Sequence, residues 1–168
     1  SMPYVFALLC LCGVLLTFLI RSVRYAIGMR SLRRHAYPAD DGLTEICHRL
    51  CGSWHMRQSV RVTICPALSG PVVCGMLRPV ICLPEMDYST DMAAGIFAHE
   101  LTHIRRHDLI KKRLWNLAVS LHWYNPLVYL ARRDADRFLE LACDEAFLTP
   151  VSEAARVKYG EVLLSILR

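Results

Sequence analysis

The chain has 168 residues, a net charge of +5 and a hydrophobic content of 54%. This length suffices for one modest domain with a core. The mean hydropathy of +0.29 exceeds that of ordinary soluble domains, and the excess lies largely at the N-terminus.

Residues 3–20 carry no charged side chain. At 1.5 Å per residue they make a helix of roughly 27 Å, just enough for the hydrocarbon core of a bilayer. A signal peptide would have a charged start and a shorter apolar stretch. We therefore predict a transmembrane helix over residues 1–20, with Ser1 and Met2 interpreted as a remnant of expression.

A basic segment follows at once, with five arginines and no acid in residues 21–34. The positive-inside rule places this side in the cytoplasm. Because the segment adjoins the predicted span, the lipid bilayer is the expected partner and no nucleic acid is expected. We assign residues 21–56 to this juxtamembrane segment and an amphipathic helix that starts after Asp40 and ends near Gly52.

The eight cysteines lack paired CxxC spacing, and two of them lie in the predicted span. On the cytoplasmic side we expect reduced thiols that behave as small apolar residues. Short β-rich runs bounded by proline and glycine predict a three-stranded sheet within residues 59–83. The third segment, residues 57–168, is predicted to be a compact α+β domain that is mostly helical.

The next helix contains the run His99-Glu100-Leu101-Thr102-His103. Ser89 is its predicted N-cap, and we expect it to reach about His107. Histidines four apart share one helix face and can bind one Zn²⁺, while Glu100 can reach the metal-activated water. His107 lies about 12 Å from His99 along a straight helix, too far to share the ion, and is expected to be an interhelical hydrogen-bond partner.

Catalytic zinc needs a third protein ligand. Beyond a predicted helix start at Asn125-Pro126, Glu140 and Asp144 lie one turn apart on one helix face. Glu140 can complete the site, and Asp144 can accept a hydrogen bond from a ligand histidine. Salt bridges to Arg133 and Arg137 explain the same spacing, so the sequence leaves both interpretations open. We expect this helix to reach about Leu148, and Ser152 to cap a last helix.

Two segments carry a family resemblance: HELTHIRRHD, and WYNPLVYLARRDADRFLELACDEAFL with its NPL turn and ExxCD motif. They resemble the BlaR/MecR family of bacterial antibiotic-sensing membrane metallopeptidases, over roughly residues 59–165. The resemblance implies a gluzincin-type, zincin-like fold related to HtpX and CAAX prenyl proteases. It implies His99, His103 and Glu140 as zinc ligands, Glu100 as the catalytic residue and Asp144 as a residue that orients a ligand.

We expect a zinc-dependent endopeptidase that acts on a cytoplasmic protein, a repressor or the chain itself, in transmembrane signalling. An extended substrate can pair with the predicted strand formed by Val72, Val73, Cys74, Gly75 and Met76, although a purely structural role explains this strand equally well. An oxyanion donor is expected beside the zinc, and the candidates are Tyr124, His122 and His107.

Two other functions fit the same sequence. One is a signal transducer without catalysis, whose zinc site is structural or vacant, although such a site has no use for Glu100. The other is an HtpX-like quality-control protease. The resemblance also implies that the chain is a fragment of a larger protein, with further spans on either side.

Overall fold

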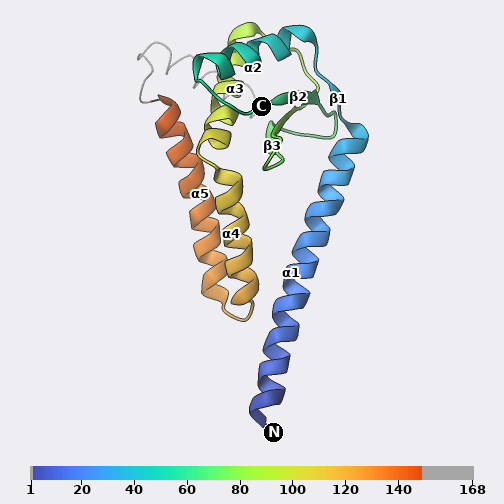
Figure 1. Ribbon diagram of the computed structural model, residues 1–168, viewed down its shortest axis with the longest axis vertical. Helices are drawn as coiled ribbons and strands as arrows, with labels where there is room; N and C mark the ends of the chain where they lie inside the picture. Colours follow the sequence, from blue (N-terminus) through green and yellow to red (C-terminus); the bar gives the residue numbers. More distant parts are fainter. Residues whose placement is uncertain (1, 149–168) are drawn as a thin grey trace.

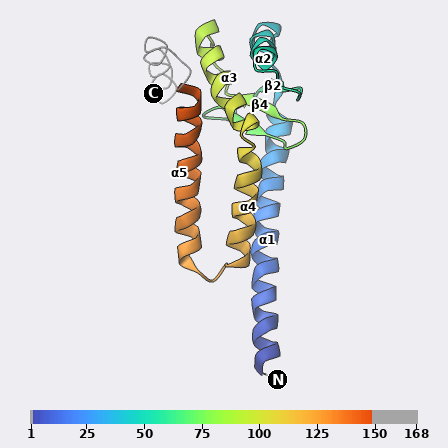
Figure 2. The ribbon, with the colours of Figure 1, turned by 60° about the vertical axis from the view of Figure 1, so that its left-hand side comes forward.

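The computed structural model describes residues 2–148 as a small sheet flanked by helices, with three long helices extending from it (Figures 1 and 2). The predicted α+β class with a mostly helical content is confirmed. The elements are, in order, α1 (Met2–His35), β1 (Tyr37–Pro38), α2 (Asp41–Ser53), β2 (Arg61–Ile64), β3 (Val72–Cys74), β4 (Val80–Leu83), α3 (Thr90–Arg105), α4 (Asp108–Leu121) and α5 (Pro126–Leu148).

Helix α1 continues 15 residues beyond the predicted span, because the basic segment joins the apolar stretch without a break. It is the one helix among residues 2–148 that is long and apolar enough to cross a membrane, and none of its residues is buried. An apolar helix that the protein itself leaves uncovered needs another apolar environment. Its exposure therefore agrees with a membrane span.

The sheet has four strands in the order β1-β2-β4-β3; the three predicted within residues 59–83 are present as β2, β3 and β4, and a fourth was missed. Strands β2 and β4 are parallel, while β1 and β3 pair antiparallel with their neighbours. The missed strand is β1, which has two residues and pairs Tyr37 with Ile64 and Pro38 with Thr63. So short a strand has no alternation of apolar and polar residues, and its proline is tolerated because β1 is at an edge.

Helices α2 and α3 supply the core above the sheet. Asp40 caps α2, since its carboxylate accepts from the Leu43 N–H at 3.2 Å. Cys47 and Cys51 on α2 are buried against the sheet and against Phe97 and Leu101 of α3. All eight cysteines are described, and all are free thiols. The five in the sheet region and α2 act as small core residues, as expected.

Helix α3 begins at its predicted cap, Ser89, whose hydroxyl accepts from the Met92 N–H at 3.3 Å. It ends at Arg105, two residues earlier than predicted, because His107 adopts a left-handed conformation with φ of 57°. No glycine or proline announces this break. Helix α4 then starts in a new direction at Asp108.

Helices α4 and α5 form an antiparallel hairpin (Figure 2). Its turn confirms the predicted start at Asn125-Pro126: the Asn125 side chain accepts from the Leu127 N–H at 3.0 Å, and Pro126 is the first helical residue. The predicted helix after Ser152 lies outside the described residues.

Replacing Gly75 with alanine tests the turn between β3 and β4. Gly75 has φ of +85°, and an added Cβ would overlap the carbonyl oxygen of Arg78. We expect Gly75→Ala to lower the free energy of unfolding by about 1–3 kcal/mol, measured by thermal unfolding in detergent. Gly70→Ala is the control, since nothing lies within 4 Å of its Cβ position; equal melting temperatures for the two variants would contradict the prediction.

Candidate metal centre

The two histidines of the HExxH run lie one turn apart on α3 and face the same space. The Nε2 atoms of His99 and His103 are 3.2 Å apart. Both rings are largely buried, with side chains 18% and 11% exposed. The helix therefore places two imidazole nitrogens side by side, as the four-residue spacing predicts.

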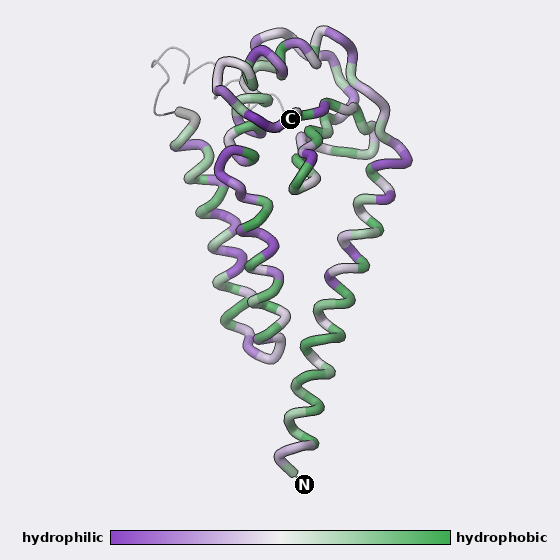
Figure 3. The backbone as a smooth tube through the Cα atoms, viewed as in Figure 1, coloured by the Kyte–Doolittle hydropathy of each residue, from purple (hydrophilic) through white to green (hydrophobic). Residues whose placement is uncertain are grey.

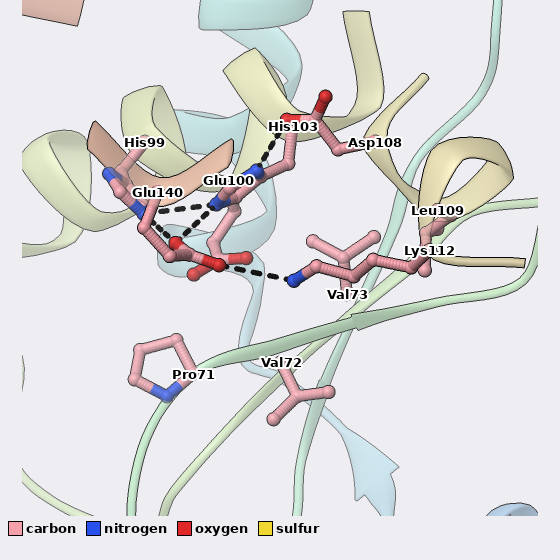
Figure 4. A pocket seen from close by; sticks show the side chains of 10 residues that line it. All are labelled: Pro71, Val72, Val73, His99, Glu100, His103, Asp108, Leu109, Lys112 and Glu140. Carbon is pink, nitrogen blue, oxygen red and sulfur yellow. Dashed lines mark hydrogen bonds and ion pairs between the residues drawn. The ribbon is translucent and has the colours of Figure 1, made fainter. Parts of the chain in front are cut away.

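Glu140 on α5 brings a third ligand atom to this point (Figure 4). Its Oε2 atom lies 3.1 Å from His103 Nε2 and 3.9 Å from His99 Nε2. Helix α5 is held there in part by Arg106, which donates to the Ala142 carbonyl at 2.8 Å. The carboxylate of Glu140 thus contacts the two histidines and Lys112, whereas Arg137 pairs with Asp134.

The outer nitrogens of both rings are bonded to carboxylates. His103 Nδ1 lies 2.8 Å from Asp108 Oδ2, and His99 Nδ1 lies 3.2 Å from Asp144 Oδ1. An ionised carboxylate only accepts, so each Nδ1 carries a proton, and in the neutral ring, which is the form that binds a metal, Nε2 then carries the lone pair. The geometry of Asp144 is the one expected from the sequence.

This donor set fits a Zn²⁺ ion. Tetrahedral zinc at about 2.0–2.1 Å from each ligand places ligand atoms about 3.3 Å apart, close to the three separations of 3.1, 3.2 and 3.9 Å. Two lone pairs and a carboxylate oxygen that meet this closely repel one another unless positive charge lies between them. The residues present therefore suit a dication.

Asp108 is the site residue that the sequence interpretation missed. Its side chain is 1% exposed and also accepts from Lys111 at 2.7 Å. Residues five apart do not share a face of a continuous helix. Asp108 reaches His103 because the chain breaks at the left-handed His107, and no local sequence signal announces that break.

Cys143 offers a further ligand atom beside the histidines. It is fully buried, and its sulfur lies within 4.8 Å of ligand atoms of His99 and His103. The thiol donates to the His99 carbonyl at 3.5 Å, which holds the sulfur against the backbone of α3. The described residues thus contain two candidate third ligands, Glu140 and Cys143.

Glu100 differs from the other carboxylates of the site in its burial and its pKa. Its side chain lines the cavity that His99, His103 and Glu140 also line, yet the residue is only 8% exposed. Burial raises the pKa of Glu100 to about 7, with the nearby Glu140 adding to the effect. A carboxyl group with a pKa near neutrality can both accept and return a proton at physiological pH.

The candidate ligand residues show the pKa shifts expected of closely spaced groups. Burial, then the neighbouring His103, lowers the pKa of His99. Burial disfavours the charged form of His103, but Cys143, Glu140 and Asp108 outweigh it and raise its pKa to about 11. The hydrogen bond from His103 lowers the pKa of Glu140 to about 2. The opposite shifts of His103 and Glu140 correspond to one proton held between these two side chains.

One wall of a cavity of about 300 Å³ is formed by His99, Glu100, His103, Asp108 and Glu140 (Figure 4). The opposite wall is Pro71, Val72 and Val73, at the start of the edge strand β3. Lys112, from the second turn of α4, also lines the cavity and lies 3.1 Å from Glu140 Oε1. The sequence interpretation did not identify this cation.

The other residues named for substrate or oxyanion contacts lie elsewhere. Gly75, Met76 and His107 line a separate small pocket, and Cys74 is buried with its sulfur 3.5 Å from that of Cys82. The exposed His107 ring forms no hydrogen bond with any residue in 2–148, so the expected interhelical bond is not found in the part of the chain that the structure describes. Tyr124 and His122 lie beyond the far end of α4, roughly 20 Å from its start, and do not contact this cavity.

A histidine pair one turn apart on a buried helix, with a glutamate inside the pair, is the pattern of metallopeptidases. The sequence model of the family described as BlaR1 peptidase M56 matches residues 2–168, and this chain belongs to that family. The regulatory protein BlaR1 of Bacillus licheniformis is 31% identical over 124 residues, which are 73% of this chain and 21% of the relative.

The methicillin resistance mecR1 proteins of Staphylococcus aureus (strain Mu50) and Staphylococcus epidermidis are each 28% identical over 117 residues. The aligned region is 67% of this chain and 20% of each relative. The chain therefore spans about a fifth of the length of the curated relatives that it matches. The resemblance to the BlaR/MecR family is confirmed.

The raised pKa of Glu100 predicts a pH-dependent cost to stability in the metal-free protein. Between the ordinary pKa near 4.5 and the folded value near 7, the unfolded chain ionises Glu100 while the folded chain does not, so the free energy of unfolding falls as pH rises. We expect Glu100→Gln to be more stable than wild type at pH 8, by at most about 3 kcal/mol.

Thermal unfolding in detergent with a chelator at pH 4.5 and pH 8 measures this difference. The advantage of Glu100→Gln should be small at the lower pH. Glu45→Gln, an exposed substitution on α2, should show no such trend. An advantage that does not change with pH would contradict the assigned shift.

Proposed function

We propose that this chain is the catalytic domain of a membrane-anchored zinc endopeptidase that cleaves a protein substrate during transmembrane signalling. One observation carries the proposal: His99 Nε2, His103 Nε2 and Glu140 Oε2 converge within 3.9 Å of one another, beside the buried carboxyl group of Glu100. A structural metal site alone gives no reason for a buried carboxyl group at this place that is not needed as a ligand.

The residues divide the chemistry between them. His99, His103 and Glu140 would hold Zn²⁺, which when bound supplies a Lewis acid that acidifies a water molecule and polarises a carbonyl group. Glu100 accepts a proton from the attacking water and returns it to the nitrogen of the leaving amine. Asp108 and Asp144 keep both ligand rings in the tautomer that presents Nε2 to the metal. Lys112 supplies positive charge at the cavity wall, where a developing oxyanion would be stabilised.

The edge strand β3 offers a binding surface for an extended substrate. Among the described strands it pairs with β4 alone, so its other edge is open. Val72 and Val73 lie at the cavity wall opposite Glu100. A peptide added to this edge would bind through main-chain hydrogen bonds and pass the metal ligands.

The membrane and signalling parts of the proposal rest on other observations. The exposed apolar helix α1 supports anchoring, and the five arginines after residue 20 favour a cytoplasmic peptidase domain. The regulatory and methicillin-resistance names of the relatives support a role in antibiotic response. The proposed substrate is a cytoplasmic protein, either a transcriptional repressor or the chain itself.

Replacing Glu100 with glutamine tests catalysis directly. The variant should retain zinc, measured by elemental analysis, and should cleave fluorescent casein or itself at least 100-fold more slowly than wild type, since the proton acceptor is lost. Glu45→Gln on the exposed face of α2 is the control and should behave as wild type. Cleavage by Glu100→Gln at the wild-type rate would exclude Glu100 as the proton acceptor, and no cleavage by either protein would favour a non-catalytic transducer.

Zinc content distinguishes the candidate third ligands. We expect Glu140→Ala to lower zinc affinity at least tenfold, and Cys143→Ala to change it by less than threefold. Asp134→Ala is the matched control on the same helix, where Asp134 pairs with the exposed Arg137 at 3.8 Å. Zinc loss in Cys143→Ala with full retention in Glu140→Ala would assign the ligand to the thiol instead.

A further inference from the structure

The α4–α5 hairpin runs beside the apolar part of α1 (Figures 1 and 2). The contacts follow the two elements in order toward the turn of the hairpin. From the sheet side they are Arg113 over the Tyr25 ring at 3.6 Å, Arg21 to the Asn116 side chain at 3.3 Å, Thr17 to the Ser120 carbonyl at 3.4 Å, and Trp123 against Gly13. The turn therefore lies level with residues 13–17, well inside the uncharged stretch of α1.

The uncharged stretches of the two elements coincide. Residues 3–20 of α1 and residues 114–131 of the hairpin contain no lysine, arginine, aspartate or glutamate. Figure 3 shows the lower half of α1 coloured mainly as hydrophobic. The hairpin also exposes large apolar side chains in this region: Leu114, Leu117, Leu121, Leu127 and Leu130. Leucines exposed beside a span at the same depth match the hydrocarbon layer.

On α1, α4 and α5, the first arginine beyond the uncharged stretch lies at a similar height along the helices. Arg21 follows the uncharged stretch of α1, Arg113 precedes that of the hairpin, and Arg132 follows it. Arginines at the ends of apolar helices lie at the headgroup level of a bilayer. These three residues therefore mark the expected membrane surface.

A cavity of about 470 Å³ opens at this level between α1, α4 and α5. Three of its lining residues are cations, Arg21, Arg24 and Arg132, and none of the described lining residues is acidic. The nearest carboxylate to Arg132 is that of Asp136, whose Oδ2 lies 3.7 Å from the Arg132 Nε. The rest of the wall combines hydrogen-bonding and apolar groups: Thr17, Ile20, Tyr25 and Asn116.

We propose that this cavity binds the headgroup of an anionic phospholipid while the turn of the α4–α5 hairpin lies among the acyl chains. The guanidinium groups of Arg21, Arg24 and Arg132 face the phosphate, which they can bind through charge-assisted hydrogen bonds. Ile20 and the leucines below contact the acyl chains. The proposal goes beyond peptidase activity but rests on the proposed membrane anchoring by α1.

This position also locates the peptidase site. Lys112 lines the metal cavity and lies one turn of α4, about 6 Å, from Asn116, which contacts Arg21 at the membrane surface. The metal cavity is thus close to the headgroups. A scissile bond would have to lie within a few residues of the membrane or be brought to its surface.

The test compares lipid binding by two doubly substituted chains. Arg24→Gln with Arg132→Gln removes two cavity cations, whereas Arg30→Gln with Arg133→Gln removes the same charge from exposed positions outside the cavity on the same two helices. Each protein is reconstituted in phosphatidylcholine nanodiscs containing phosphatidylglycerol, and the retained lipid is counted by native mass spectrometry. We expect wild type and the control to retain phosphatidylglycerol, and the cavity variant to lose about tenfold in preference for it.

Three outcomes would overturn the proposal. Equal loss in both variants would show diffuse attraction instead of a site, and displacement by millimolar glycerol 3-phosphate would identify a soluble phosphate as the ligand. Circular dichroism measures the helical content of both variants, and a value equal to that of wild type excludes misfolding as the cause of a lost lipid preference. If the wild-type protein does not float with phosphatidylcholine liposomes, the proposed anchoring by α1 is wrong, and with it part of the proposed function. If only the lipid preference is absent, the proposed anchoring still holds.

Discussion

Three electron-rich atoms from two helices meet at one point, and the arrangement of this protein depends on what neutralises them. His99 Nε2, His103 Nε2 and Glu140 Oε2 lie 3.1 to 3.9 Å apart. Such a cluster is stable only with positive charge at its centre. Without a metal, a proton on His103 Nε2 can bond to Glu140 Oε2 at 3.1 Å, in agreement with the raised pKa of His103 and the lowered pKa of Glu140. A dication satisfies all three atoms at once.

This requirement links parts of the chain that are distant in sequence. Helix α3 packs against α2 and the sheet, which fixes the two histidines from below. Helix α5 approaches from the other side and is tied to the end of α3 by the bond from Arg106 to the Ala142 carbonyl. Helix α4 adds Asp108 behind His103. Each of the three helices therefore contributes to the ligand set or to its orientation.

Local patterns predicted the helices that carry the site. The four-residue spacing placed His99 and His103 on one face, and Ser89 and Asn125 were identified as caps that the structure confirms. These features depend on residues within one or two turns of each other. Residue spacing also suggested Glu140 as a ligand, but salt bridges to Arg133 and Arg137 explained the same spacing equally well. Only a tertiary contact, that of Glu140 with the two histidines, distinguishes the two interpretations.

The remainder depended on long-range contacts. Strand β1 forms because β2 offers an edge to Tyr37 and Pro38, and two residues alone carry no periodic signal. Asp108 became a partner of His103 because His107 adopts a left-handed conformation without a glycine. Neither event has a local cause visible in the sequence. The sequence therefore predicted which side chains converge better than it predicted Asp108, which contacts one of them.

The left-handed residue His107 makes the orientation of α4 part of the geometry of the histidine pair. Because His107 separates α3 from α4, Asp108 reaches His103 as the first residue of a different helix. Near the far end of that helix, the Ser120 carbonyl accepts from Thr17 of α1. A turn of α4 about its own axis relative to α3 would therefore change the bond between Asp108 and His103.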